Sequence, residues 1–153
     1  MKKLPLFALI ALVAAALLLM ISPALAEFGV NWSATYLNCP TQPAGTTTID
    51  INTCSQVATQ TGINGINFNW GPGSPLQGVN SDYFIVRFES VQTFQQGTFE
   101  FIVGSDDGVR VFIDNVLVLD RFIGRTFTED RFQQTLTAGP HALRVEYLEI
   151  IDQ

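Results

Sequence analysis

Residues 109–119 read Val-Arg-Val-Phe-Ile-Asp-Asn-Val-Leu-Val-Leu, which is two apolar runs joined by Asp114 and Asn115. Both turn residues tolerate positive φ, the backbone conformation that a two-residue hairpin loop requires. We therefore predict an antiparallel hairpin whose strands are Val109–Ile113 and Val116–Leu119. This hairpin places the chain in the all-β class.

Alternating apolar residues predict further strands on both sides of this hairpin. Arg131–Thr137 and His141–Ile150 flank a Gly-Pro turn and form a second hairpin. Earlier strand candidates are Asn31–Leu37, Ile66–Trp70, Asp82–Glu89 and Thr98–Val103. Short strands separated by turns, with no convincing helix, are typical of an antiparallel β-sandwich or barrel with two sheets packed about one core.

Residues 1–26 have the build of a secretory signal peptide. Lys2 and Lys3 precede an apolar run, and a small-x-small triplet ends at Ala26, where we expect cleavage. The alternative is an uncleaved membrane anchor, because the run is nearly long enough to span a bilayer. In both cases the positive charge stays inside, so residues 27–153, the expected β domain, lie outside the cytoplasm and the product is secreted or associated with the cell surface.

The expected mature domain is acidic. Removal of residues 1–26 takes both lysines and leaves six arginines against fourteen acidic residues. Nucleic-acid binding needs basic residues that displace counterions from phosphates, so we expect no nucleic-acid partner. Docking on anionic lipid is disfavoured for the same reason, which leaves no membrane contact beyond the signal segment. The charge suits cations and neutral polar ligands.

The two cysteines of the chain, Cys39 and Cys54, lie in the exported part. In an oxidising compartment they are expected to form a disulfide. Closing a loop of about 15 residues stabilises a fold by about 3 kcal/mol in the chain-entropy model. Two free thiols are the alternative, and a metal pair is disfavoured because one histidine cannot complete a soft site.

Two adjacent acids, Asp106 and Asp107, follow a predicted strand and precede Gly108. Successive side chains of a regular strand point to opposite faces, so both carboxylates can share a ligand only where the backbone is irregular. We expect Gly108 to supply that conformational freedom. A calcium ion would remove the repulsion between the two acids, and its 6–8 oxygen ligands would have to include other groups. The alternative is that the pair only builds a turn.

Residues for catalysis are scarce. Residues 27–153 contain one histidine, His141, and no lysine. His141 lies beside a Gly-Pro turn, where a surface or turn-stabilising histidine is expected rather than a catalytic base. We therefore expect the chain not to be an enzyme. Polar side chains such as Asp82, Arg87, Arg110 and Arg144 are expected to form exposed ion pairs between strands, each worth about 0–1 kcal/mol.

The chain resembles a known family, the PA14 domain. The resemblance lies in ordered motifs between about Asn31 and Glu149, which cover most of the expected mature chain. They are Trp70-Gly-Pro-Gly-Ser-Pro75, Asp82-Tyr-Phe-Ile-Val-Arg-Phe88, Gly97-Thr-Phe-Glu-Phe101, Ser105-Asp-Asp-Gly-Val-Arg-Val-Phe-Ile-Asp114 and Leu136-Thr-Ala-Gly-Pro-His-Ala-Leu-Arg-Val-Glu-Tyr147. The family recurs in surface adhesins and in glycosidases.

The resemblance implies a function and a metal. In adhesin members, two adjacent aspartates joined by a cis peptide hold a calcium ion that binds sugar hydroxyls, and Asp106 and Asp107 occupy that motif. A second calcium loop would be residues 120–131, where Asp120 and Asp130 are candidate ligand-binding oxygens and Phe122 is a candidate sugar platform. Each of these three has an alternative role, as a solvated loop charge or a core ring.

The resemblance also shows two departures. The cysteine loop looks like an insertion, and no final family strand is found before Gln153, which is consistent with a truncated frame or a fragment. An unpaired edge left in this way would favour aggregation or completion by a partner.

Three functional hypotheses follow. The first is a secreted, calcium-dependent, lectin-like module that binds glycans or cell-surface polysaccharide. The second is a structural or protein-interaction module of the cell envelope with no metal or sugar site. The third, a glycosidase with Asp106 and Asp107 as its acid pair, is disfavoured because one dipeptide offers no separation of the two roles.

Overall fold

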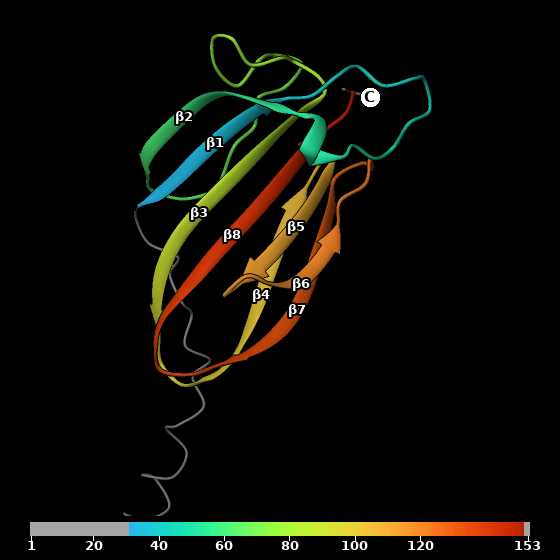
Figure 1. Ribbon diagram of the computed structural model, residues 1–153. Coiled ribbons are helices and arrows are strands. Elements are labelled where there is room, and N and C mark those ends of the chain that lie inside the picture. The colour runs from blue at the N-terminus through green and yellow to red at the C-terminus, as the bar shows by residue number, and fades with distance from the viewer. Residues whose placement is uncertain (1–30, 152–153) are drawn as a thin grey trace, which may run out of the picture.

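The computed structural model describes residues 31–151, which form two antiparallel β-sheets (Figure 1). The larger sheet has the order β2-β1-β3-β8-β5-β6 and the smaller sheet pairs β4 with β7. The elements are β1 (Trp32–Asn38), the 3-10 turn η1 (Ile51–Thr53), β2 (Ser55–Ile63), β3 (Phe84–Phe94), β4 (Gly97–Ser105), β5 (Gly108–Ile113), β6 (Val116–Arg121), β7 (Thr128–Leu136) and β8 (Gly139–Glu149). The predicted β-sandwich is confirmed.

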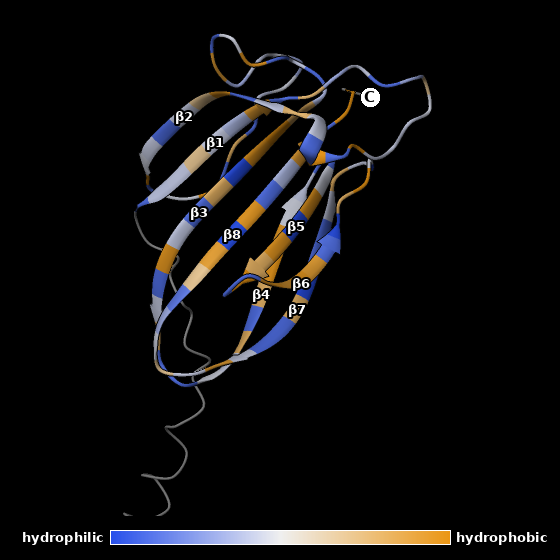
Figure 2. Cartoon of the chain, viewed as in Figure 1, coloured by the Kyte–Doolittle hydropathy of each residue, from blue (hydrophilic) through white to orange (hydrophobic). Residues whose placement is uncertain are grey.

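Alternation of side chains along each strand builds the core. Figure 2 shows apolar and polar residues alternating along β3 and β8, the two central strands. Phe84, Val86 and Phe88 of β3 are nearly inaccessible to solvent and face the smaller sheet. Phe101 of β4 stacks on Phe132 of β7, with ring centroids 5.0 Å apart, and both belong to the packing between the sheets. Burial of these rings is the main favourable term for folding.

The predicted hairpin is present. β5 and β6 pair antiparallel, and the turn residues Asp114 and Asn115 have φ of 50° and 66°. Those are the left-handed angles of a two-residue hairpin turn. Gly139, at the start of β8, has φ of 128°, a conformation that L side chains rarely adopt, so glycine is required there.

Three predictions about strands were wrong. The predicted hairpin of Arg131–Thr137 with His141–Ile150 does not form, because β7 pairs with β4 in the smaller sheet whereas β8 pairs with β3 and β5 in the larger one. Ile66–Trp70 is a loop rather than a strand, and its aromatic rings stack on each other and on β3: Phe68 lies 5.1 Å from Trp70 and 5.5 Å from Phe88. β2 was not predicted, because seven of its nine residues are exposed and its few apolar side chains do not alternate with polar ones. It is an edge strand, held by backbone pairing to β1.

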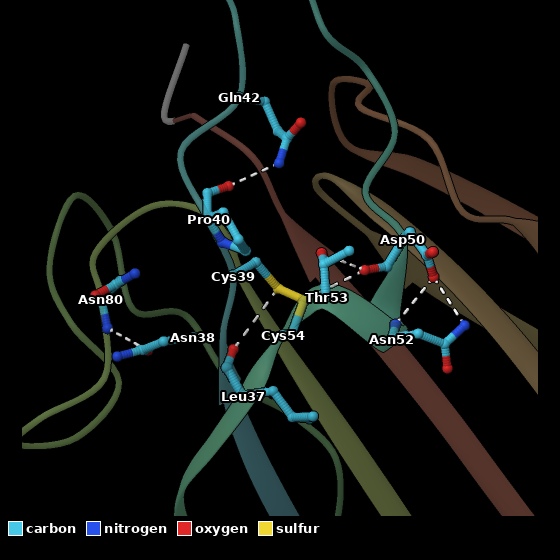
Figure 3. Close-up of a disulfide and its surroundings, with 10 residues drawn as sticks. All are labelled: Leu37, Asn38, Cys39, Pro40, Gln42, Asp50, Asn52, Thr53, Cys54 and Asn80. Carbon is cyan, nitrogen blue, oxygen red and sulfur yellow. Dashed lines mark hydrogen bonds between the residues drawn. A yellow bond between two sulfur atoms is a disulfide. The ribbon is translucent and has the colours of Figure 1, made fainter.

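The predicted disulfide between Cys39 and Cys54 is present (Figure 3). It closes the cysteine loop, residues 39–54, which contains η1 with Asp50 as its N-cap: the Asp50 carboxylate accepts the N–H of Asn52 at 2.9 Å. Ile49 of this loop packs with Ile85 and Leu148 into a second apolar cluster on the outer face of the larger sheet. The loop therefore covers part of a sheet face that would otherwise meet water.

Three arginines predicted to form exposed pairs instead converge on one buried acid. Glu146 of β8 is 1% exposed. Its carboxylate accepts from Nε of Arg87 at 2.8 Å and from Nε of Arg110, and Nε of Arg144 lies 3.5 Å away. The register of β3, β8 and β5 places these strands side by side, so residues distant in sequence meet around one charge.

The expected signal peptide lies outside the described residues. Within residues 31–151, no helix is long and apolar enough to cross a membrane.

Candidate functional site

Asp106 and Asp107 form the link between β4 and β5, two strands that belong to different sheets. The peptide bond between them is cis, as the resemblance implied. Asp106 is exposed, whereas Asp107 is 7% exposed and lies inside the domain. The pair therefore has one carboxylate at the surface and one anchored in the fold.

Backbone groups hold the Asp107 carboxylate. Oδ1 accepts the N–H of Arg125 and Oδ2 accepts the N–H of Ile150, each at 2.8 Å. Its carbonyl accepts from the Ser105 hydroxyl at 2.8 Å and from Nε of Arg125 at 3.3 Å. Each carboxylate oxygen keeps a further lone pair, because an ionised carboxylate has about four acceptor positions in total.

Gly108 is needed for space rather than for an unusual φ. A Cβ at this position would lie 2.7 Å from the Ile123 nitrogen and 2.9 Å from its carbonyl oxygen. Residues 121–127, which we call the binding loop, thus pack directly on the backbone after the acid pair. The expectation that Gly108 supplies conformational freedom is corrected accordingly.

Tyr147 and Glu149 of β8 complete an acidic group that was missed at the level of the sequence. The Tyr147 hydroxyl lies within hydrogen-bond reach of the Asp106 carbonyl and of the Glu149 carboxyl group. Burial, together with the negative charges of Asp107 and Asp106, raises the pKa of Glu149 to about 7, against the opposing hydrogen bond from Tyr147. Burial and the neighbouring acids also raise the pKa of the Tyr147 hydroxyl well above its ordinary value.

A cleft of about 490 Å³ opens beside Asp106. Its floor is the inner face of β3 and β8, with Phe84, Val145 and Tyr147; one wall is the loop 66–71 and the other is the end of β4 with Phe127. The volume lies in the range of small-ligand sites, and a lining that combines aromatic and aliphatic side chains with a few polar groups is typical of them.

The other predicted ligand-binding residues lie away from this cleft. Asp120 is exposed and accepts the N–H of Phe122 at 3.2 Å. Phe122 packs on the apolar cluster under the cysteine loop, and the Arg110 guanidinium covers its ring at 4.2 Å. Neither residue lines the cleft.

Asp130 is engaged by two arginines. Its Oδ2 lies 2.7 Å from Nη2 of Arg125 and its Oδ1 lies 3.2 Å from Nε of Arg121. Burial opposes ionisation, but Arg125 and Arg121 outweigh it and hold the pKa of Asp130 below its usual range. The same Arg125 guanidinium also donates to the Ser105 hydroxyl at 2.8 Å, so the binding loop presents a cation rather than an oxygen ligand to the acid pair.

The acidic side chains at this site are of the type that binds calcium. Asp106 and Asp107 offer carboxylate oxygens, the ligands that calcium prefers, and Glu149 is close enough for the charges of both to shift its pKa. Within residues 31–151, no three His, Cys, Asp or Glu side chains already stand at the spacing of a metal site. A calcium ion held by Asp106 and Asp107 would therefore draw its remaining oxygens from backbone, water or ligand.

His141 takes no part in this site. It is 8% exposed and bonded to two turns, so of the two predicted alternatives, surface or turn-stabilising, the second is confirmed. Its Nδ1 lies 2.6 Å from Oδ2 of Asp114, and its Nε2 lies 3.1 Å from the Thr137 carbonyl oxygen.

Sequence reasoning found the acid pair but missed most of what surrounds it, namely Phe68, Arg125, Phe127, Tyr147 and Glu149. Tyr147 and Glu149 are residues i and i+2 of β8, and side chains two residues apart on a strand lie on the same face. That spacing was the available signal for these two. For Phe68, Arg125 and Phe127 there was none, because loop residues carry no periodicity.

Comparisons with known proteins agree with the fold. Residues 29–152 match the PA14 domain family. The anti-sigma-I factor RsgI3 of Acetivibrio thermocellus is 35% identical over 86 residues, which are 55% of this chain and 13% of that relative's length. The chain therefore spans only a small part of the curated relative that it matches.

Solved structures share the fold. An anti-sigma factor domain-containing protein superposes with a TM-score of 0.64 and 26% identity, covering 82% of this chain and 40% of that one. A PA14 sugar-binding domain from an RTX adhesin superposes with a TM-score of 0.59 and 21% identity, covering 78% and 82%. A GH31 α-xylosidase from Xanthomonas citri gives a TM-score of 0.57 and 17% identity, covering 83% and 14%.

Proposed function

The chain belongs to the PA14 domain family, and from that premise we propose that it is an exported carbohydrate-binding module. Its ligands are glycans or cell-surface polysaccharide, and they enter the cleft beside Asp106. One observation carries the proposal: the exposed carboxylate of Asp106 lies at the edge of a cleft that has aromatic side chains in its lining and is large enough for a small ligand. The fold that the chain shares with a sugar-binding domain of an RTX adhesin supports it further.

Calcium is part of the proposal. Asp106 and Asp107 would hold the ion, which would supply positive charge to sugar hydroxyls at the mouth of the cleft. Arg125 and Ile150 fix the orientation of Asp107 through their backbone N–H groups, whatever occupies the site. The second aspartate is thus positioned by the fold and the first is free to meet a ligand.

The test is a glycan array probed with the purified protein, in millimolar calcium and again in EDTA. We expect calcium-dependent binding that Asp106→Ala abolishes, together with a melting temperature that rises with calcium by mass action. A blank array in calcium, with no calcium-dependent rise in melting temperature, would instead favour a structural or protein-interaction module of the envelope.

We further propose that the module binds sugars without cleaving them. The adjacent acids Asp106 and Asp107 share one link between strands, whereas glycosidases use two carboxyl groups in distinct environments across the scissile bond. The check is hydrolysis of a panel of chromogenic glycosides, which we expect to stay at the buffer rate. Hydrolysis lost in Asp106→Asn would contradict this.

The anti-sigma relative favours a second candidate, in which the same binding event serves signalling from outside the cytoplasm. Transcript profiling separates this role from adhesion. A strain that lacks the gene for this chain is compared with its parent, each grown with and without the polysaccharide that the protein binds on the array. A polysaccharide response that disappears on deletion would support signalling, and an unchanged response would leave adhesion.

A further inference from the structure

We propose that the larger sheet carries, on its outer face, a binding site for a tetrahedral oxyanion, a sulfate or phosphate group, held by Arg87, Arg110 and Arg144. The outer face is the one turned away from the smaller sheet, and none of the three arginines lines the cleft beside Asp106. The inference goes beyond the proposed carbohydrate-binding function and does not depend on it.

The three arginines come from three adjacent strands. β3, β8 and β5 lie side by side (Figure 1), and in their register Arg87 and Arg110 are both opposite Glu146. Arg144 precedes Glu146 by two residues on β8, so the two side chains lie on the same face. Arg87 follows Val86, which faces the core between the sheets, so the face that the arginines share is the outer one.

Positive charge is in excess at this cluster. Three guanidinium groups surround one carboxylate, that of Glu146, whose side chain is 2% exposed. They are three of the six arginines in residues 27–153, a segment that is acidic as a whole. Guanidinium groups stay charged at physiological pH, so the cluster holds two positive charges more than its own carboxylate balances. A dianion is the ligand that matches this excess.

The arginines also have hydrogen-bond donors to offer. Each faces Glu146 with its Nε, and within residues 31–151 no Nη atom of the three is hydrogen-bonded to a protein acceptor. Nε of Arg144 is buried, lies 3.5 Å from the Glu146 oxygen and has no hydrogen-bond partner among the described residues. A buried donor without an acceptor is costly, most of all in a charged group. Oxyanions accept two parallel hydrogen bonds from a guanidinium group, so such a ligand suits these donors.

Aromatic rings hold two of the guanidinium groups in place. That of Arg144 lies 3.9 Å from the centroid of the Phe112 ring, and that of Arg110 lies 4.2 Å from the centroid of the Phe122 ring. The three arginine side chains are 23–33% exposed, so they are partly shielded from water but still reachable. Side chains already fixed in this way lose little freedom when a ligand binds.

The same face has room for the ligand. A hollow of about 330 Å³ adjoins Arg144, and its lining also includes Ser33, Ser90 and Asn115, whose side chains are neutral and polar. The volume suffices for a tetrahedral ion and for part of a sugar that carries it as an ester.

Two exposed acids stand at the edge of the cluster. In the register Glu89 is opposite Arg144 and Asp120 is opposite Arg110, and among the described residues neither acid forms an ion pair with that arginine. Both acids repel an anion, but water screens an exposed charge more strongly than a partly buried one. The arginines therefore outweigh the acids, and each acid weakens the site.

The test is titration calorimetry of the purified protein in calcium-free buffer of low ionic strength. Inorganic sulfate, inorganic phosphate and acetate are compared. We expect one site per chain, with sulfate and phosphate bound at least about tenfold more tightly than acetate, because acetate carries half the charge of sulfate. Sulfate that binds no more tightly than acetate would overturn the inference. Sulfate binding that requires added calcium would also overturn it, since the anion would then sit on a metal ion rather than on the arginines.

Variants test the assigned residues. Arg144 is the arginine to replace, because its Nε makes no hydrogen bond to Glu146 and its loss disturbs the cluster least. Arg144→Gln should weaken sulfate binding at least about tenfold. Arg131→Gln is the matched control: Arg131 is 54% exposed and pairs with acids of the smaller sheet, so sulfate should bind as in the parent. Glu89→Gln removes a repelling charge and should tighten binding several-fold.

A second substitution keeps the test decisive if Arg144→Gln does not fold. Arg144→Lys retains the positive charge but not the planar fork, so sulfate binding should weaken several-fold while the urea midpoint stays close to that of the parent. Sulfate affinity equal to that of the parent in every folded Arg144 variant would overturn the assignment.

The source of the anion is decided by a last pair of titrations, with methyl glucoside 6-sulfate and with methyl glucoside. Tighter binding of the sulfated sugar than of inorganic sulfate would support a sulfated polysaccharide as the ligand, and weaker binding would support the free ion. Neutral sugar that binds the cleft while sulfate binds nowhere would overturn this site and leave the proposed function intact.

Discussion

His141 and Asp114 join the start of β8 to the turn between β5 and β6: His141 Nδ1 lies 2.6 Å from Asp114 Oδ2. The other ring nitrogen faces the Thr137 carbonyl oxygen at 3.1 Å, and a carbonyl can only accept. The Thr137 hydroxyl lies 3.3 Å from the same nitrogen and can donate to it, so both the neutral and the protonated ring find partners here, while Asp114 and the Thr137 carbonyl favour the protonated one. The second Asp114 oxygen accepts the N–H of Ala142 at 2.9 Å, so the turn between β5 and β6 is bonded to two consecutive residues of β8.

This pair predicts a pH dependence of stability. The hydrogen bonds to Asp114 and Thr137 raise the pKa of His141, and the bond to His141 lowers the pKa of Asp114. The His141 contribution is complete below the ordinary histidine pKa of about 6.5 and is lost as pH rises through the raised folded value. The Asp114 contribution is lost as pH falls through the lowered folded value of that carboxyl group.

We therefore expect the urea midpoint to fall as pH rises above about 6.5. Glu149, whose pKa is raised to about 7, contributes in the same direction, so the measurement belongs in the Glu149→Gln background. There, His141→Asn should remove the remaining slope, and Asp114→Asn should reduce it. A slope that survives the histidine substitution would refute the assignment to this pair.

Glu146→Gln should destabilise the domain strongly. The substitution leaves Arg87, Arg110 and Arg144 facing each other without the buried carboxylate that joins them. Removing one member of a buried ionic group costs about 3–5 kcal/mol, and we expect the lower end because the arginines are partly exposed. Urea unfolding at pH 7 measures the loss. Glu89→Gln, an exposed acid opposite Arg144 in the register, is the control and should change stability by less than about 0.5 kcal/mol.

Gly108→Ala should disturb the binding loop. Its Cβ would collide with both the nitrogen and the carbonyl oxygen of Ile123, which are backbone atoms and cannot rotate away. We expect a loss of about 1–3 kcal/mol in unfolding free energy, as for overpacked cores, and weaker glycan binding. Gly65→Ala is the matched control, because its Cβ would meet nothing within 4 Å. Equal stability of the two variants would contradict the close approach.

Loss of the disulfide should also destabilise the domain. Replacing both Cys39 and Cys54 by serine opens a loop closed at a sequence separation of 15, worth about 3 kcal/mol in the entropy model. Thermal unfolding of the variant and of the parent, with the parent also measured under reducing conditions, gives the difference. A reduced parent that melts like the oxidised one would show that the loop is held by its own packing.

The fold was predictable where one face of a strand is buried. Apolar and polar residues alternate along β3, β5 and β8, because one face of each strand is buried. The Asp114–Asn115 pair identifies the hairpin, because both residues tolerate the positive φ that its turn requires. β2 leaves no mark, since an exposed edge strand needs no apolar face. Ile66–Trp70 has the residues of a strand, but its rings pack in a loop against β3, where tertiary contact overrides local propensity.

The acid pair of the site was predictable, but its surroundings were not. Asp106 and Asp107 stand together in the sequence, and any arrangement of the backbone keeps them adjacent. Arg125 and Glu149 meet that pair only because a loop and the end of β8 converge on it. The cluster around Glu146 has the same origin, since three strands distant in sequence supply its four side chains.

The N–H of Gly124, in the binding loop, donates to the carbonyl oxygen of Thr47 in the cysteine loop at 2.6 Å. Two segments that share no strand are thus joined, and a Cβ at Gly124 would lie 3.6 Å from both Thr47 Cα and Asp107 Oδ1 and 3.1 Å from Ile150 Cδ1. We therefore expect substitutions in the cysteine loop to shift the binding loop through this bond, and to change the affinity of the proposed site without replacing any of its residues.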